Sequence, residues 1–167
     1  MSFAAQTLYI PPQEVYNRFL QDRLFDAGDV ARLGLRLLDP QQTHDLIGHT
    51  KDWSIQIPYH DVKGQLTGFD RVRVLQPRGK MKYSQARGSG SHVYFPPNVP
   101  WAANGVMADV DVPLVITEGE FKAYQIAKAE ATYAVVGLAG VTSWGDKSGL
   151  PLHRDLMQFA WQRKNSF

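Results

Sequence analysis

A short apolar run that passes directly into a glycine flanked by two glutamates constrains the fold more than any other feature of this sequence. Residues Pro113 to Thr117 have the length and composition of a strand buried on both faces of a parallel sheet. Glu118-Gly119-Glu120 follows, and a helix is predicted from about Glu120 to Ala131. A second apolar strand, Tyr133 to Val136, then runs into Gly137-Leu138-Ala139-Gly140. Strand, helix and strand in this order predict a parallel crossover unit of the α/β class.

The segment after this unit is expected to form one more helix, from roughly Leu150 to Gln162, before a third parallel strand. The printed sequence stops at Phe167 instead. We therefore expect one apolar strand, Leu114 to Thr117 or Tyr133 to Val136, to lack a neighbour and to favour self-association. Side chains of the last helix should then be partly exposed, namely Leu152, Leu156, Phe159 and Trp161.

The first fifty residues are expected to be helical and to serve packing or linkage, because no chemistry can be assigned to them. Pro12 to Phe25 has its apolar residues close to one helical stripe, and Asp29 to Leu37 is a weaker helical segment. Asp39-Pro40 predicts a helix start, since an N-cap oxygen precedes a proline at the first helical position, and Gly48 predicts the end of that helix.

Strand-like alternation begins near Trp53 and predicts a hairpin that is followed by further short strands. Because strand side chains repeat every two residues, Arg71 and Arg73 should share one face of the second strand. The expected elements are strands at Ser54 to Tyr59 and Leu66 to Leu75 with a turn at Asp61 to Gly64, and short strands around Lys82-Tyr83 and at His92 to Phe95.

Three regions are therefore expected: a helical region at residues 1–50, a basic β-rich region at 51–108 and the α/β segment at 109–167, so that the chain is α+β overall. Proline and asparagine make Pro96 to Asp109 a loop at the last boundary. From Arg71 to Ala108 there is no Asp or Glu. The positive charge of this segment suits an anionic partner. A solvated loop whose charge is balanced by acidic residues elsewhere in the fold explains it equally well. The basic residues of the segment are Arg71, Arg73, Arg78, Lys80, Lys82 and Arg87.

Composition removes several classes of protein. With no cysteine, the chain can form neither disulfides nor a thiolate zinc site. No apolar run approaches the length of a membrane span, and the N-terminus lacks the layout of a signal peptide. A cytoplasmic protein of a bacterium or its virus is expected, without a membrane partner.

The two glutamates suggest chemistry at the carboxyl end of a parallel strand, where ligands of open α/β sheets gather. A carboxylate of Glu118 or Glu120 could coordinate Mg²⁺, which takes oxygen ligands and bridges phosphates. It could equally accept a proton from a 3′-hydroxyl that attacks a nucleotide. The plainer interpretation is that both acids favour the positive end of the helix dipole.

The residues around this pair resemble the first motif of the Toprim nucleotidyl-transfer domain of bacterial, phage and plasmid DNA primases. In that motif an apolar strand ends in Glu-Gly and a helix starts at once, as in Leu114 to Ala123 here. The ending Glu120-Phe121-Lys122-Ala123 is more similar to the Toprim-like domains of phage and plasmid replication proteins than to the cellular primase. Ala134 to Val141 resembles the second Toprim element, and the resemblance implies that Gly119, Gly137 and Gly140 are turn glycines.

The hairpin extends the resemblance, which runs from about Trp53 to the C-terminus. In the family, a basic subdomain packs beside the Toprim domain and handles template, nucleotide or product. The resemblance implies that Arg71, Arg73 and Lys82 hold phosphates, with Tyr83 beside them. Tyr83, Tyr94 and Phe95 are aromatic residues among the basic ones and are candidates for stacking on bases, although core packing is the better interpretation for Phe95.

One family motif is missing. A Toprim site is completed by Asp-x-Asp after the third strand, whereas Asp109-Val110-Asp111 precedes the first strand, and Asp146 and Asp155 stand alone. Magnesium held by Glu118 and Glu120 alone would be weakly bound. We expect the isolated chain to be inactive as a nucleotidyltransferase unless another segment or a partner supplies the motif.

Two functions remain open at this stage. The first is the N-terminal part of a primase-like DNA replication protein of a phage or mobile element, which synthesises RNA primers on single-stranded DNA from nucleoside triphosphates with Mg²⁺. A helicase or the missing Toprim segment would be a further partner. The second is a non-catalytic module with a degenerate Toprim fold that binds single-stranded DNA or RNA, or a replication partner.

Overall fold

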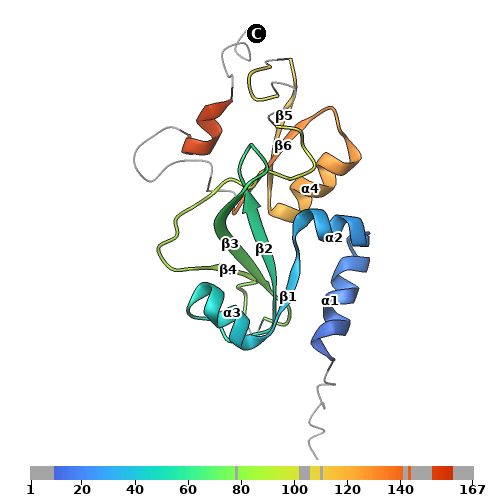
Figure 1. Ribbon diagram of the computed structural model, residues 1–167, viewed down its shortest axis with the longest axis vertical. Helices are drawn as coiled ribbons and strands as arrows, with labels where there is room; N and C mark the ends of the chain where they lie inside the picture. Colours follow the sequence, from blue (N-terminus) through green and yellow to red (C-terminus); the bar gives the residue numbers. More distant parts are fainter. Residues whose placement is uncertain are drawn as a thin grey trace, which may run out of the picture. The chain divides into compact units, whose positions relative to one another are not determined.

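The computed structural model describes residues 10–77, 79–101, 106–109, 111–140, 143 and 152–159. Figure 1 shows the arrangement of its helices and strands. Within these residues the chain forms two units, one from Met1–Ile57 with Asp70–Ala86 and one from Pro58–Phe69 with Arg87–Phe167. The expected boundaries at residues 50 and 108 stay a prediction. The units divide the hairpin strands between them, so a unit is not one continuous stretch of sequence.

The first unit begins with helices whose ends are set by side-chain caps and glycines. Asp26 and Asp29 form a reciprocal capping box at the start of α2, and Gly34 ends this helix with a φ of +66°. The helix predicted from Asp29 to Leu37 is therefore wrong in its second half, because the chain turns at Gly34 and continues as a strand. The helices and first strand are α1 Pro12–Gln21, α2 Ala27–Leu33, β1 Arg36–Leu38 and α3 Pro40–Ile47.

The start and end predicted for α3 are confirmed. The Asp39 side chain accepts a hydrogen bond from the backbone N–H of Gln42, Pro40 occupies the first helical turn, and Gly48 follows with a φ of +82°. Thr43 on this helix shares a buried 2.8 Å hydrogen bond with Ser54 of the sheet. Ile47 packs with Leu38 and Val72 in the apolar core of this unit, so α3 covers the sheet through its apolar side.

Four strands form a sheet in the order β1-β2-β3-β4. In it β1 runs antiparallel to β2 with Leu37 opposite Ile55, and β3 runs antiparallel to β4 with Arg73 opposite Tyr83. The predicted hairpin is confirmed, and Asp61 closes its turn by accepting hydrogen bonds from the backbone N–H groups of Lys63 and Gln65 at 2.8 and 2.9 Å. The strands are β2 Ser54–His60, β3 Leu66–Val74 and β4 Tyr83–Gln85.

The second unit contains the predicted parallel crossover, which confirms the α/β class. Strand β5 Leu114–Glu118 pairs in parallel with β6 Ala134–Leu138, and α4 Glu120–Ala129 connects them and packs on both (Figure 1). All five residues of β6 are buried, whereas Ile116 at the middle of β5 is 41% exposed. The expectation that β5 is buried on both faces is therefore wrong. Within the described residues β5 has β6 as its one partner and is an edge strand.

Two further expectations for this unit are corrected. Residues 92–95 form a single antiparallel bridge between Tyr94 and Gly137 in place of a strand. The described part of the predicted last helix, residues 152–159, contains a 3₁₀ helix at Arg154–Gln158. Its Leu156 is fully buried and Phe159 packs against Phe95 and Trp101, so these side chains are not exposed as predicted. Trp161 lies outside the described residues.

In the part of the chain that the structure describes, none of the helices combines the length and the apolar character that crossing a bilayer requires.

Candidate functional site

Glu118 is the last residue of β5, and its side chain is exposed at the carboxyl end of the parallel pair. Gly119 follows with a φ of +88°, a conformation that other residues adopt only with strain, and α4 begins at the next residue. The backbone N–H of Gly119 donates to the carbonyl of Leu138 at 2.8 Å. This bond ties the turn to the end of β6 and fixes where Glu118 leaves the sheet.

Gly137 has a role that differs from the expected one. It lies inside β6 and not in a turn, and a β-carbon there would stand 3.0 Å from the carbonyl oxygen of Gly119 and 3.2 Å from the β-carbon of Ala123. The missing side chain thus allows β6 to approach the β5–α4 turn closely. Gly140 follows β6 in a bend, and a β-carbon there would meet Ser143 Oγ at 3.8 Å.

Glu120 occupies a different environment from Glu118. It is 2% exposed, and its Oε1 accepts a 2.7 Å hydrogen bond from the hydroxyl of Tyr59. Burial, with the nearby Glu120 and Tyr124 as smaller causes, raises the pKa of the Tyr94 phenol well above its ordinary value. Glu120 is therefore part of the packed interior of the second unit. To coordinate a metal beside Glu118, the buried carboxylate of Glu120 would have to become accessible.

Metal ligands do not gather in the described part of the chain. Among those residues no group of three or more His, Cys, Asp or Glu side chains lies close enough to hold a metal ion. An exposed Glu118 and a buried Glu120 do not by themselves fit a magnesium site, which needs several converging oxygen ligands.

The basic residues of β3 and β4 lie around one aromatic ring in the first unit. The guanidinium carbons of Arg71 and Arg73 lie 5.2 and 5.3 Å from the centroid of the Tyr83 ring, which confirms that the two arginines share a face. Arg71 is 8% exposed, whereas Arg73 and Tyr83 are half-buried. Lys82 is exposed, and its backbone carbonyl accepts from the N–H of Val74 at 2.9 Å. Arg73 and Lys82 are thus the accessible cations among the three predicted ones.

The aromatic residues that the sequence offered as candidates for stacking on bases also differ in how exposed they are. Tyr94 is fully buried and Phe95 is 4% exposed, so neither can stack on a base as they stand. Packing against Trp101 and Phe159 confirms the core interpretation of Phe95. Arg78 lies outside the described residues.

The sequence did not reveal that the N-terminal region contributes an arginine and an aromatic ring to this group of cation–ring contacts. The guanidinium carbon of Arg23 lies 3.8 Å from the centroid of the Phe19 ring, and that of Arg73 lies 5.0 Å from the same centroid. Phe19 and Arg23 are four residues apart, the spacing at which side chains meet on a helical turn. This spacing was the available signal, but it does not predict that β3 brings Arg73 to the same ring.

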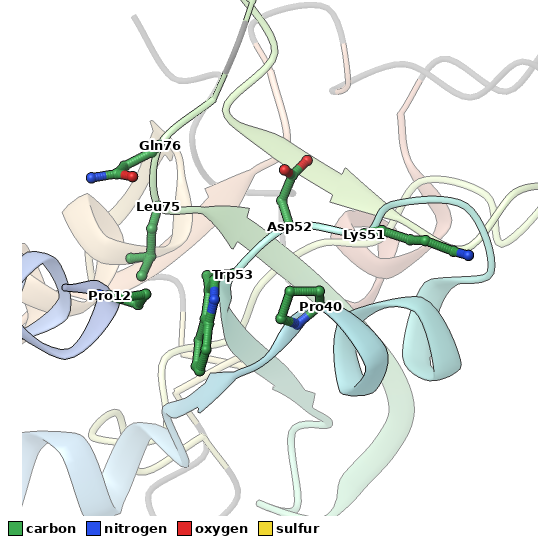
Figure 2. Close-up of a pocket in the computed structure, with 7 residues that line it drawn as sticks. All are labelled: Pro12, Pro40, Lys51, Asp52, Trp53, Leu75 and Gln76. Carbon is green, nitrogen blue, oxygen red and sulfur yellow. The ribbon is translucent and has the colours of Figure 1, made fainter. Parts of the chain in front are cut away.

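Pockets within single units offer less chemistry. In the first unit Trp53, which is 39% exposed, stands between Pro12 and Pro40 in a cavity of about 240 Å³ (Figure 2). Its charged lining residues, Lys51 and Asp52, are of opposite sign, so the pocket favours neither an anionic nor a cationic ligand.

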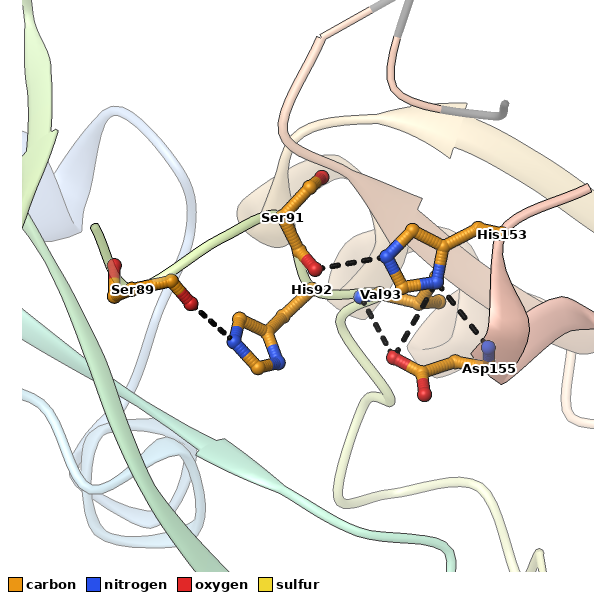
Figure 3. A network of polar contacts seen from close by, with 6 residues as sticks. All are labelled: Ser89, Ser91, His92, Val93, His153 and Asp155. Carbon is orange, nitrogen blue, oxygen red and sulfur yellow. Dashed lines mark hydrogen bonds and ion pairs between the residues drawn. The ribbon is translucent and has the colours of Figure 1, made fainter. Parts of the chain in front are cut away.

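A pocket in the described part of the second unit has a volume of about 270 Å³, and its lining includes His60, His92 and Asp155. Figure 3 shows the polar network beside it, in which His153 Nε2 contacts the carbonyl of Ser91 at 2.8 Å and Asp155 accepts from the N–H of Val93 at 3.3 Å. These side chains bond mainly to backbone groups, and the network holds residues 89–93 against the 3₁₀ helix.

No protein-family model matches the sequence, and no curated protein matches it. Solved structures of primases do. The RNA polymerase domain of the Mycobacterium tuberculosis primase DnaG has a TM-score of 0.57 and 19% identity, over 99% of this chain and 59% of that one. The same domain in complex with double-stranded DNA has a TM-score of 0.56 and 18% identity, over 94% of this chain and 57% of that one.

A DnaG primase catalytic domain bound to single-stranded DNA has a TM-score of 0.51 and 15% identity, over 81% of this chain and 51% of that one. The chain therefore spans little more than half the length of these primase chains. Its fold is the mixed α/β fold of DnaG primase catalytic cores over the shared part, which confirms the primase-type resemblance at the level of fold.

Proposed function

We propose that this chain is part of a primase-like DNA replication protein with a Toprim-type nucleotidyl-transfer core, encoded by a phage or mobile element. The observation that carries the proposal is the position of Glu118, exposed at the carboxyl end of β5 directly before Gly119 and α4, in a fold shared with DnaG primase cores. The ending Glu120-Phe121-Lys122-Ala123 supports the phage or plasmid subtype.

In this proposal Glu118 acts on the attacking group. Its exposed carboxylate can accept the proton of a 3′-hydroxyl as that oxygen attacks the α-phosphate of a nucleoside triphosphate. A phosphodiester bond then forms, and pyrophosphate leaves as the bond between the α-phosphate and the β-phosphate breaks. Mg²⁺, when bound by a complete carboxylate set, would neutralise charge on the phosphates. Because the described residues offer one accessible carboxylate at this strand end, the further ligands must come from an Asp-x-Asp segment or from substrate.

The first unit supplies nucleic-acid binding in the same proposal. Arg73 and Lys82 would contact phosphates of single-stranded DNA, RNA or the incoming triphosphate, and the half-buried Tyr83 ring lies beside Arg73. Arg71 is too buried to reach a phosphate and would act by holding the Tyr83 ring. Of the three similar structures described above, two contain DNA, one single-stranded and one double-stranded, which supports a nucleic-acid partner here.

A second candidate function is favoured by the state of Glu120. Its burial against Tyr59 leaves Glu118 without an adjacent accessible carboxylate. A non-catalytic module that binds single-stranded nucleic acid or a replication partner such as a helicase needs the basic strands but not Glu118.

Primer synthesis separates the two candidates. The chain is incubated with single-stranded template, nucleoside triphosphates and Mg²⁺, with and without a segment that carries the third-strand Asp-x-Asp motif. The catalytic proposal expects product only with that segment, and loss of product in Glu118→Gln. Template binding without any product in either mixture, and unchanged by Glu118→Gln, would establish the non-catalytic module instead.

A further inference from the structure

The pocket of about 270 Å³ in the second unit has an acidic lining. Its charged side chains include Asp61 and Asp155, and among the described lining residues there is neither lysine nor arginine. The lining also contains the imidazoles of His60 and His92. Burial lowers the pKa of His60, although the neighbouring Asp61 opposes this shift, so the ring is neutral near pH 7. The pocket therefore repels phosphates and other anions and suits a cation.

The ring of His92 presents a lone pair. Its Nε2 donates to the carbonyl oxygen of Ser89 at 2.9 Å (Figure 3). Because a carbonyl group can only accept, the proton of the neutral ring lies on Nε2, and Nδ1 is an acceptor. The ring packs on Phe69 with the two centroids 4.0 Å apart, which limits its movement. Among the described residues no group donates to this Nδ1, so it is open to a ligand.

Asp155 is held in place through one of its two oxygens. Its Oδ2 accepts from the backbone N–H of Val93 at 3.3 Å (Figure 3). Nδ1 of His153 accepts from the backbone N–H of Asp155 at 3.2 Å, so this ring is in its neutral form and leaves the carboxylate charge uncompensated. No described residue donates to Oδ1 of Asp155, which remains an acceptor for a ligand.

Asp61 is fixed in a similar way at the turn of the hairpin. Its Oδ1 accepts from the backbone N–H groups of Lys63 and Gln65 at 2.8 and 2.9 Å. The hydrogen bond from Gln65 is the largest cause of the lowered pKa of Asp61, and the charge of Lys63 is a smaller one, so the carboxylate is ionised near pH 7. Within the described residues its Oδ2 has no donor.

These acceptors line one pocket but do not converge on one point. Among the described residues no three His, Asp or Glu side chains lie close enough to hold a metal ion. A metal ion or a compact ammonium group needs its acceptors around a single atom, whereas a planar guanidinium group spreads five N–H donors along its edge. A guanidinium group is also more weakly hydrated than an ammonium group, which suits the apolar part of the lining. That part is formed by the buried residues Tyr59, Val93 and Phe95.

We propose that this pocket binds a guanidinium group, whose N–H groups donate to Asp155, Asp61 and Nδ1 of His92. A small guanidinium compound and an arginine side chain of a partner protein offer the same chemistry, and the experiment distinguishes them. The site uses none of the residues assigned to nucleotide or nucleic-acid binding. Its failure would therefore leave the proposed function unchanged.

The first test titrates the wild-type chain with methylguanidinium at constant ionic strength and follows the imidazole nitrogen resonances by NMR. The resonances of His92 should shift. Those of His49, whose ring nitrogens contact Thr50 and the carbonyl of Gln85, should stay in place. Methylammonium is the matched compact cation and should shift His92 much less. An unmoved His92 resonance, or an equal response to methylammonium, would overturn the proposal without depending on the folding of any variant.

The second test measures methylguanidinium affinity by calorimetry. Asp155→Asn keeps the shape of the side chain but removes its charge, and it should weaken binding by about tenfold, the loss expected for one charge-assisted hydrogen bond. Asp45→Asn is the control, because it removes an exposed carboxylate of the first unit and should leave the affinity unchanged. Wild-type affinity in a folded Asp155→Asn chain would contradict the proposal.

The same calorimetry separates the two sources of the guanidinium group. Agmatine represents a small compound, and an arginine tripeptide with blocked ends represents a partner protein. Tighter binding of agmatine assigns the pocket to a small compound, and tighter binding of the tripeptide assigns it to a partner's arginine. Binding of neither would overturn the site.

Discussion

The hydroxyl of Tyr59 donates a 2.7 Å hydrogen bond to Oε1 of Glu120 in the interior of the second unit. This bond ties the end of β2 to the first turn of α4, although the two residues are 61 positions apart in the sequence. It also assigns different roles to the glutamates of the Glu-Gly-Glu motif. Glu120 anchors the helix inside the unit, and Glu118 remains exposed at the end of β5.

The first prediction tests this division of roles by unfolding in urea. Tyr59→Phe removes the donor to a buried carboxylate and should lower the free energy of unfolding by about 1–3 kcal/mol. Glu120→Gln should also destabilise the fold, while the exposed Glu118→Gln should change stability by less than about 0.5 kcal/mol. The double variant of Tyr59 and Glu120 should lose less than the sum of the single losses. Additive losses would show that the two side chains are not coupled.

The second prediction concerns the close approach of β6 to the turn before α4. Gly137→Ala places a methyl group 3.0 Å from a backbone oxygen that cannot move away without disturbing the start of α4. Overpacking of this kind should cost about 1–3 kcal/mol, measured as a lower unfolding midpoint. Gly140→Ala is the control, because its methyl group would meet Ser143 Oγ at 3.8 Å. Equal stabilities of the two variants would contradict the packing argument.

The third prediction concerns the basic residues of β3 and β4. The triple variant Arg71→Ala, Arg73→Ala and Lys82→Ala should bind single-stranded DNA or RNA more weakly and with a flatter salt dependence. Arg71→Ala alone should act mainly on stability, because its side chain is 8% exposed and packs on Tyr83. A triple change of exposed lysines in the second unit, at Lys63, Lys122 and Lys128, removes the same charge as a control. If the folded triple variant of Arg71, Arg73 and Lys82 binds as tightly as the wild type, these residues are not part of the binding site.

The fourth prediction is a pH dependence of stability that arises from His60. Burial lowers the pKa of this imidazole, and the neighbouring Asp61 only partly offsets the effect. Because the unfolded chain titrates His60 near its ordinary value of about 6.5, the unfolded state binds more protons below that pH. The free energy of unfolding should therefore fall as the pH is lowered from about 7 to 5. His60→Gln should weaken this pH dependence in unfolding experiments. Parallel wild-type and variant curves would show that other groups cause the dependence.

The fifth prediction concerns the edge of the parallel pair. Within the described residues β5 is paired on one side, and Ile116 on it is 41% exposed. Unpaired strand edges with apolar side chains promote association, so light scattering should show self-association that rises with concentration. Ile116→Lys should reduce it without a loss of secondary structure. A wild-type chain that stays monomeric across the series would mean that the edge is covered.

Local signals account for the parts of the fold that the sequence predicts correctly. Caps and glycines need only neighbouring residues, so Asp39 and Gly48 mark the ends of α3, and the turn from Asp61 to Gly64 closes the hairpin. Strand, glycine and helix around Gly119 are equally local. The same locality explains the errors, because a stretch of apolar residues has the same composition on an edge strand such as β5 as it has in a buried strand.

The sequence by itself determined the crossover unit, the place of Glu118 at the end of its first strand, and the shared face of Arg71 and Arg73, because chain connectivity and strand periodicity fix these. Only the tertiary structure decided which polar groups are buried and which side chains meet. Glu120 joins Tyr59, and Arg23 joins Arg73 on Phe19, across separations that no local pattern encodes. Burial and long-range contact depend on how the whole chain packs, and they separate the buried, anchoring carboxylate of Glu120 from the exposed carboxylate of Glu118.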